Sequence, residues 1–280
     1  MLKKLFLFWL FLLSLFALSC NNNALKPDVY SKESIDKKYP YWQVGIENFE
    51  IDSRLNKRTV ITVDEKKYIL VCMALMRLAV NTDEFAERVK ASEGSLKSSV
   101  GDSYDGHTLQ YGEQYNAQKL IDSVRSLKYN FTYRKMNVSA GTGTGEQGKS
   151  RYLRYGLQNE NDIPTGKWIG LSSGNWGSLD DVLFGDYFTY MQSQTYANVA
   201  GLMFHEHMHN IGFNHFGDYN VPAALQGVVT QIINEMLWKP IEGPALKKKY
   251  SKQLDELIAY YLTEYKHLLN EDTVFDPSSK

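Results

Sequence analysis

Cysteine is scarce in this chain of 280 residues, which contains only Cys20 and Cys72. A framework of disulfide bonds therefore cannot hold the fold together, and the chain is long enough to bury a core instead. Neither sign of charge is in excess, since 31 Lys and Arg balance 32 Asp and Glu and the formal net charge is −1. This balance gives no basic surplus for binding nucleic acid or an anionic membrane.

Long hydrophobic runs are also scarce, and the clearest one lies at the N-terminus. Residues 5–18 are nearly all apolar and follow the basic pair Lys3 and Lys4, as in a secretory signal peptide. The run is short for a membrane-spanning helix, so a retained signal-anchor is the weaker interpretation. The sequence A-L-S-C at residues 17–20 resembles the lipobox of bacterial lipoproteins.

The resemblance to lipoproteins divides the chain into three parts. Residues 1–19 would be removed as the signal peptide, and residues 20–40 would form a lipidated Cys20 and a polar tether. Residues 41–280 would form one folded domain. Asn21 follows Cys20 where a retention signal would have Asp, which favours the outer membrane or the cell surface over the inner membrane of the cell envelope.

Histidine is also scarce, and its distribution is the most informative feature of the chain. Four of the six histidines lie within residues 205–215, which read H-E-H-M-H-N-I-G-F-N-H. This segment matches H-E-x-x-H-x-x-G-x-x-H without a mismatch. The composition of the chain gives such a match a chance of about 10⁻⁵ per sequence, so coincidence explains it poorly.

The spacing of the motif suits a zinc ion held by one helix and the turn after it. His205 and His209 are four residues apart, so both imidazoles leave a helix on the same face. Glu206 lies about 100° around the helix from His205, where it can reach a metal-bound water without binding the metal. Gly212 can adopt a positive φ that ends the helix and turns His215 toward the ion. Three neutral imidazoles leave one position for water, as in catalytic zinc sites.

Residues 205–215 resemble the zinc-binding signature of the metzincin metallopeptidases. By that resemblance His205, His209 and His215 are the ligands of Zn²⁺, and Glu206 is the catalytic general base. The bound water, activated by both zinc and this carboxylate, would attack a peptide carbonyl.

A looser resemblance covers residues 64–240, which are similar to bacterial and phage metzincin-like peptidases. In that group a Val-Pro segment follows the third histidine, and Val221 and Pro222 stand there in this chain. Metzincins place a Met-containing tight turn beneath the zinc, but the only Met after the motif, Met236, falls in a helical pattern. We therefore expect the Val-Pro segment to occupy the place of that turn.

Two residues near the motif have less specific patterns. His207 falls on the apolar stripe of the helix with Ala200, so we expect it in the core or behind the ligands. Tyr219 lies close enough to the third histidine to be an extra ligand or an oxyanion donor, although an ordinary loop tyrosine is the simpler interpretation.

A second motif match is not expected to bind its usual ligand. Residues 143–150 read G-T-G-E-Q-G-K-S and fit the phosphate-binding pattern G-x-x-x-x-G-K-[ST]. That loop needs a buried strand before it and a helix after it, whereas residues 128–140 are mostly polar and Pro164 follows soon. An exported protein is also separated from ATP. We expect a glycine-rich connection and no nucleotide.

For the rest of the domain, the sequence pattern predicts helices with a few strands. Apolar residues at helical spacing and capping patterns predict helices. Their ranges are residues 64–80, a helix that begins near 81–84, 115–127, 196–210, 225–237 and 250–269. Alternation predicts strands at residues 129–136 and 167–172, and a small hairpin formed by residues 41–52 and 58–63.

One predicted strand has two interpretations. By the resemblance to metzincins, residues 167–172 form the sheet edge that pairs with an extended peptide substrate. An interior strand without such a role fits the pattern equally well. The aromatic residues between 176 and 190 could line a specificity pocket, but we expect most of them to pack in the core.

These patterns predict an α+β domain of zincin-like (metzincin) fold, helix-rich with a small twisted sheet. The expected function is an envelope-anchored zinc-dependent endopeptidase acting on a peptide or protein. Two other functions remain open: a catalytically silent zinc-binding surface lipoprotein that binds a partner, and a zinc hydrolase of cell-wall amides.

Overall fold

The computed structural model describes residues 30–51, 58–104, 107–137, 151–159, 168–172, 192–214, 217–237 and 245–279. The signal peptide with Cys20, the glycine-rich match at 143–150, the aromatic segment at 176–190 and His215 lie outside the described residues. The described helices are α2 (Lys32–Lys38), α3 (Val63–Val80), α4 (Asp83–Ala91), α5 (Ala117–Arg125), α7 (Gln192–Asn210), α8 (Val221–Leu237) and α9 (Ala245–Glu264), with short 3-10 turns η2 (Glu93–Ser95), η5 (Lys266–Leu269) and η6 (Pro277–Ser279). The described strands are β1 (Gln43–Ile51), β2 (Thr59–Ile61), β3 (Ser103–Tyr104), β4 (His107–Thr108), β5 (Lys128–Asn137), β6 (Arg151–Asn159), β7 (Trp168–Ser172) and β8 (Thr273–Phe275).

Helix α3 is the centre of the fold. Thr62 and Glu65 start it with a reciprocal capping box, in which each side chain accepts a hydrogen bond from the backbone N–H of the other residue. Beyond its first turn the helix is buried almost all round, and Cys72 is a fully buried free thiol. Helices α4, α7, α8 and α9 and strand β1 all contact it, so one core serves the whole domain.

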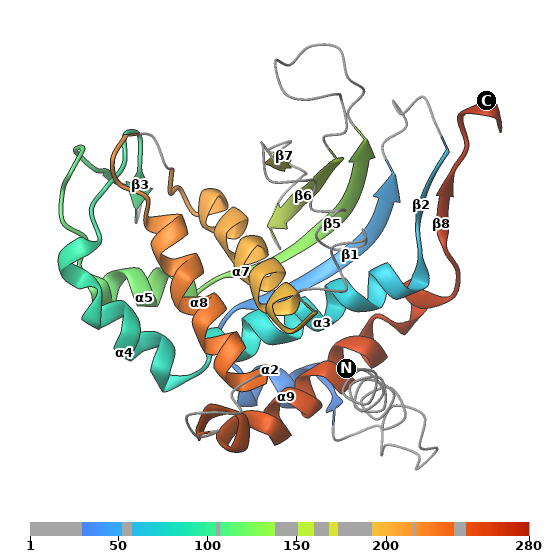
Figure 1. Cartoon of the computed structure of the whole chain (residues 1–280), viewed down its shortest axis with the longest axis horizontal. Helices are drawn as coiled ribbons and strands as arrows, with labels where there is room; N and C mark the ends of the chain where they lie inside the picture. Colours follow the sequence, from blue (N-terminus) through green and yellow to red (C-terminus); the bar gives the residue numbers. More distant parts are fainter. Residues whose placement is uncertain are drawn as a thin grey trace, which may run out of the picture.

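A four-stranded mixed sheet covers one side of these helices (Figure 1). Its order is β1-β5-β6-β7, with β1 and β5 parallel and the other pairs antiparallel. The sheet meets the helices through contacts of β1 with α3 and of β7 with α7. The fold is therefore α+β and helix-rich with a small sheet, as predicted from the sequence.

The predicted hairpin of residues 41–52 and 58–63 is wrong. Both segments form strands, but β1 pairs with β5, and β2 pairs with β8 near the end of the chain. A parallel pair cannot be joined by a short turn, and the connection from β1 to β5 contains α3, α4 and α5. Alternation identified the strands, but it could not identify partners about 80 to 220 residues away.

The predicted tether is shorter than residues 20–40, because α2 belongs to the folded domain. Ser31 caps α2, and Ile35 and Tyr39 on one side of it are buried. The hydroxyl of Tyr39 donates a hydrogen bond to Glu256 on α9 at 2.8 Å. A single apolar pair in a polar segment was too weak a signal to indicate a packed helix.

The glycine-rich match at 143–150 connects two strands. It follows β5 and leads into β6, which pairs antiparallel with β5 over nine residue pairs. A phosphate-binding loop requires a helix at the position where β6 begins.

In the described part of the chain, no helix combines the length and apolar character needed to cross a membrane.

Helix α2 is fixed to the core by a buried guanidinium group. Arg77 of α3 is 2% exposed and donates hydrogen bonds of 2.7 Å to both Oδ1 of Asp36 and the carbonyl oxygen of Tyr39. Lys32 approaches the other oxygen of Asp36 from the solvent, with its side chain 62% exposed. One carboxylate therefore has a buried cationic partner and an exposed one.

Replacing Arg77→Met should lower the free energy of unfolding by about 3 kcal/mol, because Asp36 and the carbonyl of Tyr39 lose their buried donor. The matched variant Lys32→Met removes the exposed partner of the same carboxylate and should change stability by less than about 0.5 kcal/mol. Urea denaturation of both variants measures the difference. Similar losses in the two variants would contradict this account of the packing of α2.

Candidate metal centre

Helix α7 carries the first part of the motif. His205, Glu206 and His209 all lie within its helical span, and the four-residue spacing places the two histidines one turn apart on the same face. The side chain of His205 is described and is 9% exposed. The side chains of Glu206 and His209 lie outside the described part of the structure.

The described side chains of α7 leave one stripe of the helix open. Those that are at most 1% exposed are Ala197, Val199, Ala200, Met203, Phe204, His207 and Met208. By contrast, Asn198 is exposed and Leu202 is partly exposed. These two positions lie about 20° and 60° around the helix from His205, and His209 lies between them at about 40°. The open stripe is therefore defined by Asn198 and Leu202. It lies beside His205, which is itself buried at 9% exposure, and the backbone position of His209 falls within it.

Aromatic packing fixes the opposite face of α7. The indole of Trp42 stacks on Phe204 with ring centroids 4.8 Å apart, and His207 meets the same indole edge-on at 5.6 Å. Trp42 has φ of +55°, which is rare for a large side chain, and its indole is fully buried. Burial lowers the pKa of His207 to about 3, so this imidazole is neutral at physiological pH. His207 is thus a core residue, as its position on the apolar stripe predicted.

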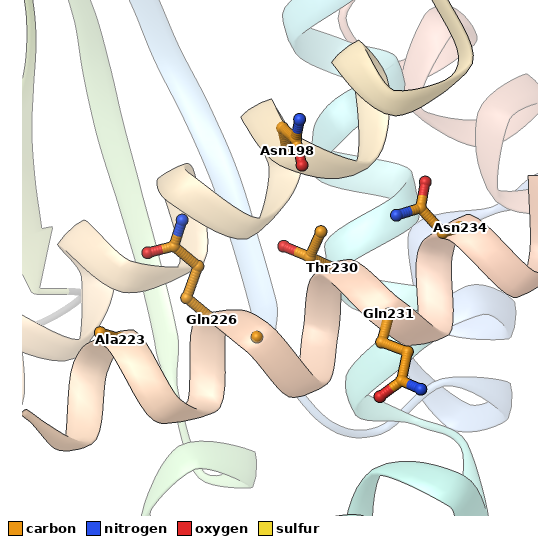
Figure 2. Close-up of a pocket in the computed structure, with 7 residues that line it drawn as sticks. Asn198, Ala223, Gln226, Thr230, Gln231 and Asn234 are labelled. Atoms are coloured by element: carbon orange, nitrogen blue, oxygen red, sulfur yellow. The ribbon is translucent and has the colours of Figure 1, made fainter. Parts of the chain in front are cut away.

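Helix α8 packs against α7 at a glycine. A Cβ atom on Gly201 would lie 2.0 Å from Oγ1 of Thr230, so the two helices approach more closely than a larger residue would allow. Beside this contact lies a shallow, open groove of about 470 Å³ (Figure 2). Its lining residues come from α7 and α8 and are Asn198, Ala223, Gln226, Gly227, Thr230, Gln231 and Asn234. The groove therefore offers amide and hydroxyl groups and no charge, and Asn198 links it to the open stripe.

The helix ends as the motif predicts. The N–H of Phe213 donates to the carbonyl of Met208 at 3.2 Å, which is the long hydrogen bond of a Schellman motif. Gly212 has φ of +103°, and its carbonyl accepts a hydrogen bond from the N–H of Ser103 at 2.8 Å. A Cβ atom at Gly212 would lie 2.1 Å from the carbonyl oxygen of Ser103. Both the backbone conformation and this close approach require glycine.

The third predicted ligand, His215, lies outside the described residues, between Asn214 and Gly217. Among the described residues, no three His, Cys, Asp or Glu side chains form a group that could hold a metal ion. The side chains of His209 and His215 are outside the described part of the chain. The donor chemistry fits zinc, because two histidines stand one turn apart on α7 and the sharp turn at Gly212 is followed in the sequence by a third.

The segment after the motif differs from a tight turn. Val221 and Pro222 are the first residues of α8, and Oδ1 of Asn220 accepts a hydrogen bond from the N–H of Ala223 at 2.9 Å to cap it. Met236 lies inside α8 and is buried, which confirms the helix predicted there.

Tyr219 has structural contacts that explain its position. Its ring packs on Tyr111 with centroids 5.3 Å apart, and the ammonium of Lys97 lies 5.4 Å from its ring centroid. These contacts agree with the simpler interpretation of a loop tyrosine and do not require a role at the metal.

Strand β7 lies at one end of the described sheet. It pairs with β6 on one side only in the described sheet, and it contacts α7. Of the two interpretations of this segment, the described strand order favours an edge strand.

Sequence reasoning missed the segment from residues 96 to 116, which packs against the turn after α7. It contains Ser103 and Tyr111, for which no motif or periodicity indicated a role; within this segment the sequence offered only His107, as a less favoured candidate for assisting catalysis. No protein-family model matches the chain, and neither a curated protein nor a solved structure matches it.

The substitution Gly212→Ala should destabilise the protein by about 2 kcal/mol or more, because alanine is strained at this φ and would collide with the carbonyl of Ser103. The matched substitution Gly227→Ala on α8 places a methyl group where no atom lies within 4 Å. It should stabilise the helix by about 0.5 to 1 kcal/mol. Chemical denaturation should give opposite signs for the two variants, and a neutral Gly212→Ala would refute the close approach.

Proposed function

We propose that this chain is a zinc-dependent endopeptidase with a zincin-like fold. The observation that carries the proposal is that the open stripe of α7, defined by Asn198 and Leu202, lies on the same face of the helix as the positions of His205 and His209. Asn198 and Leu202 are both less buried than the seven described side chains of α7 that pack in the core, as a face that meets a ligand requires. The Gly212 turn, with φ of +103°, supports a third ligand from the residues that follow.

In this proposal His205, His209 and His215 hold the metal. When bound, zinc acidifies a water molecule and polarises the carbonyl group of the substrate. Glu206 accepts the proton of the attacking water and transfers it to the leaving amine. Burial of the rest of α7 keeps the helix from shifting as the substrate binds, which preserves the alignment on which such a reaction depends.

The surroundings of α7 support a peptide as the substrate. The groove beside Gly201 offers uncharged hydrogen-bonding side chains, among them Asn198, Gln226 and Thr230 (Figure 2). Such groups suit the N–H and C=O groups of a peptide main chain better than they suit phosphate. Strand β7, at one end of the described sheet, could pair with an extended peptide.

The variant Glu206→Gln should lose at least about 100-fold in turnover while it retains zinc, because an amide is too weak a base to accept a proton from the attacking water. The purified chain would be incubated with a diverse peptide library, and zinc content would be measured on the same samples. Cuts made by the wild type, absent in Glu206→Gln and abolished by a chelator would support the proposal.

Three results would contradict it. Stoichiometric zinc without any cleavage of peptides would favour the silent zinc-binding lipoprotein. Zinc-dependent release of fragments from cell walls, without cleavage of peptides, would favour the hydrolase of cell-wall amides. Turnover unchanged in zinc-loaded Glu206→Gln would remove this residue from the mechanism.

We also propose that the chain is anchored in the cell envelope through lipid on Cys20, because the sequence at residues 17–20 resembles a lipobox. The variant Cys20→Ser should lose incorporation of labelled fatty acid and leave the membrane fraction. The matched variant is Cys72→Ala, since Cys72 is the other cysteine and is fully buried in α3. It should remain labelled and membrane-bound. Membrane-bound, unlabelled Cys20→Ser would instead indicate a signal-anchor.

A further inference from the structure

We propose that Asp102 is a positioning residue of the metal centre, which holds the segment after α7 in the conformation that presents the third ligand. This inference rests on the proposed function, because it assigns a purpose to the turn that leads to His215. Asp102 is more than 100 positions away from the motif in the sequence, and it lies in the segment that sequence reasoning missed.

The carboxylate of Asp102 is fully buried at 0% exposure and accepts three hydrogen bonds. Oδ1 accepts from the backbone N–H of Asn214 at 2.6 Å. Oδ2 accepts from the hydroxyl of Tyr115 at 2.6 Å and from the backbone N–H of Ser99 at 2.7 Å. A carboxylate can only accept hydrogen bonds, so each of these contacts requires a donor facing it. The residue that immediately precedes His215 is therefore tied to a buried anion.

Two further hydrogen bonds join the same segments. The N–H of Ser103 donates to the carbonyl of Gly212 at 2.8 Å, and Nδ2 of Asn214 donates to the carbonyl of Gly101 at 2.8 Å. Together with the bond from Asn214 to Asp102, these contacts hold residues 212–214 at both ends. The turn after α7 is thus fixed by partners outside the motif.

The residues that follow His215 and Phe216 in the sequence are held by the same segment. The hydroxyl of Tyr111 donates to Oδ2 of Asp218 at 2.9 Å and accepts from the N–H of Asp218 at 3.1 Å. Gly217, with φ of +95°, lies against the ring of Tyr111. Asn214 and Asp218, which lie on either side of His215 in the sequence, are therefore both hydrogen-bonded to this segment.

The anchoring segment is itself cross-linked, so it can act as a support. The N–H of Ser98 donates to the carbonyl of Glu113 at 2.9 Å, and the N–H of Tyr115 donates to that of Leu96 at 2.9 Å. The N–H of Leu109 donates to the backbone carbonyl of Asp102 at 2.9 Å. The ring of Tyr115 also packs on Phe213, with centroids 5.5 Å apart.

The physical reason for a buried carboxylate is the strength of its hydrogen bonds. Bonds to a charged acceptor are roughly twice as strong as neutral ones, so they suppress local opening of the segment they hold. Two of the proposed ligands lie on α7, whose backbone is packed in the core, whereas the third lies on a loop that must be ordered. When the loop is already ordered in the metal-free protein, metal binding does not have to supply the free energy of ordering it.

The test compares three substitutions in the full chain. Asp102→Asn keeps the shape but turns one acceptor into a donor, and Tyr115→Phe removes one hydrogen bond while it leaves the aromatic packing in place. The matched control is Asp122→Asn, which changes an exposed carboxylate on α5 whose side-chain partner is Gln118. Tyr115→Phe keeps the test informative if Asp102→Asn does not fold.

Three readouts separate positioning from general stability. Hydrogen exchange of the metal-free protein should accelerate at residues 211–219 in Asp102→Asn, while the exchange of α3 stays slow. Zinc affinity, measured by competition with a chelator, should fall about 10- to 100-fold in Asp102→Asn, less in Tyr115→Phe and not in Asp122→Asn. With Co²⁺ in place of zinc, the visible spectrum of Asp102→Asn should show altered coordination, which a loss of global stability alone would not produce.

The outcomes for the inference and for the proposed function differ. Unchanged exchange at residues 211–219, or unchanged zinc affinity and cobalt spectrum in a folded Asp102→Asn, would overturn the role of Asp102 alone. A wild-type chain that binds no zinc would overturn the metal centre itself, and with it this inference. Weaker zinc binding in Asp102→Asn without any peptidase activity in the wild type would support the positioning role and refute the peptidase.

Discussion

The burial of α7 on most of its described surface is the constraint on which the rest of the structure depends. Trp42 and Phe204 hold one side of the helix in the core, and Gly201 lets α8 approach the helix closely. A helix fixed in this way cannot rotate without losing apolar burial worth roughly 1.5 to 3 kcal/mol for each large side chain. The remaining open stripe at Asn198 and Leu202 is therefore held in one orientation, beside the buried His205.

The two halves of the candidate metal centre are stabilised by different kinds of interaction. The part on α7 is held by apolar packing, which is strong and not directional. The segment after Gly212 has little helical support and is held by directional hydrogen bonds to residues 99–115. The structure thus combines a rigid helix with a loop whose conformation depends on a distant support.

Much of the fold could be predicted from local patterns. Periodic apolar residues identified α3, α5, α8 and α9 because a helix face repeats within a few residues. The boundaries differed by a few residues, and α2 was missed because Ile35 and Tyr39 were its only buried apolar signal. The pairing of β1 with β5 and of β2 with β8 could not be predicted, since nothing in a strand identifies its partner.

The sequence by itself determined the spacing of His205, Glu206 and His209 and the need for glycine at position 212. These follow from the geometry of a helix and from the conformational freedom of a residue without a side chain. Only the tertiary structure decided which face of α7 stays open and which residue holds the turn. Asp102 and Asn214 are 112 positions apart, and their contact depends on how the whole core brings two loops together. A buried carboxylate is recognisable by its surroundings, and those surroundings exist only after folding.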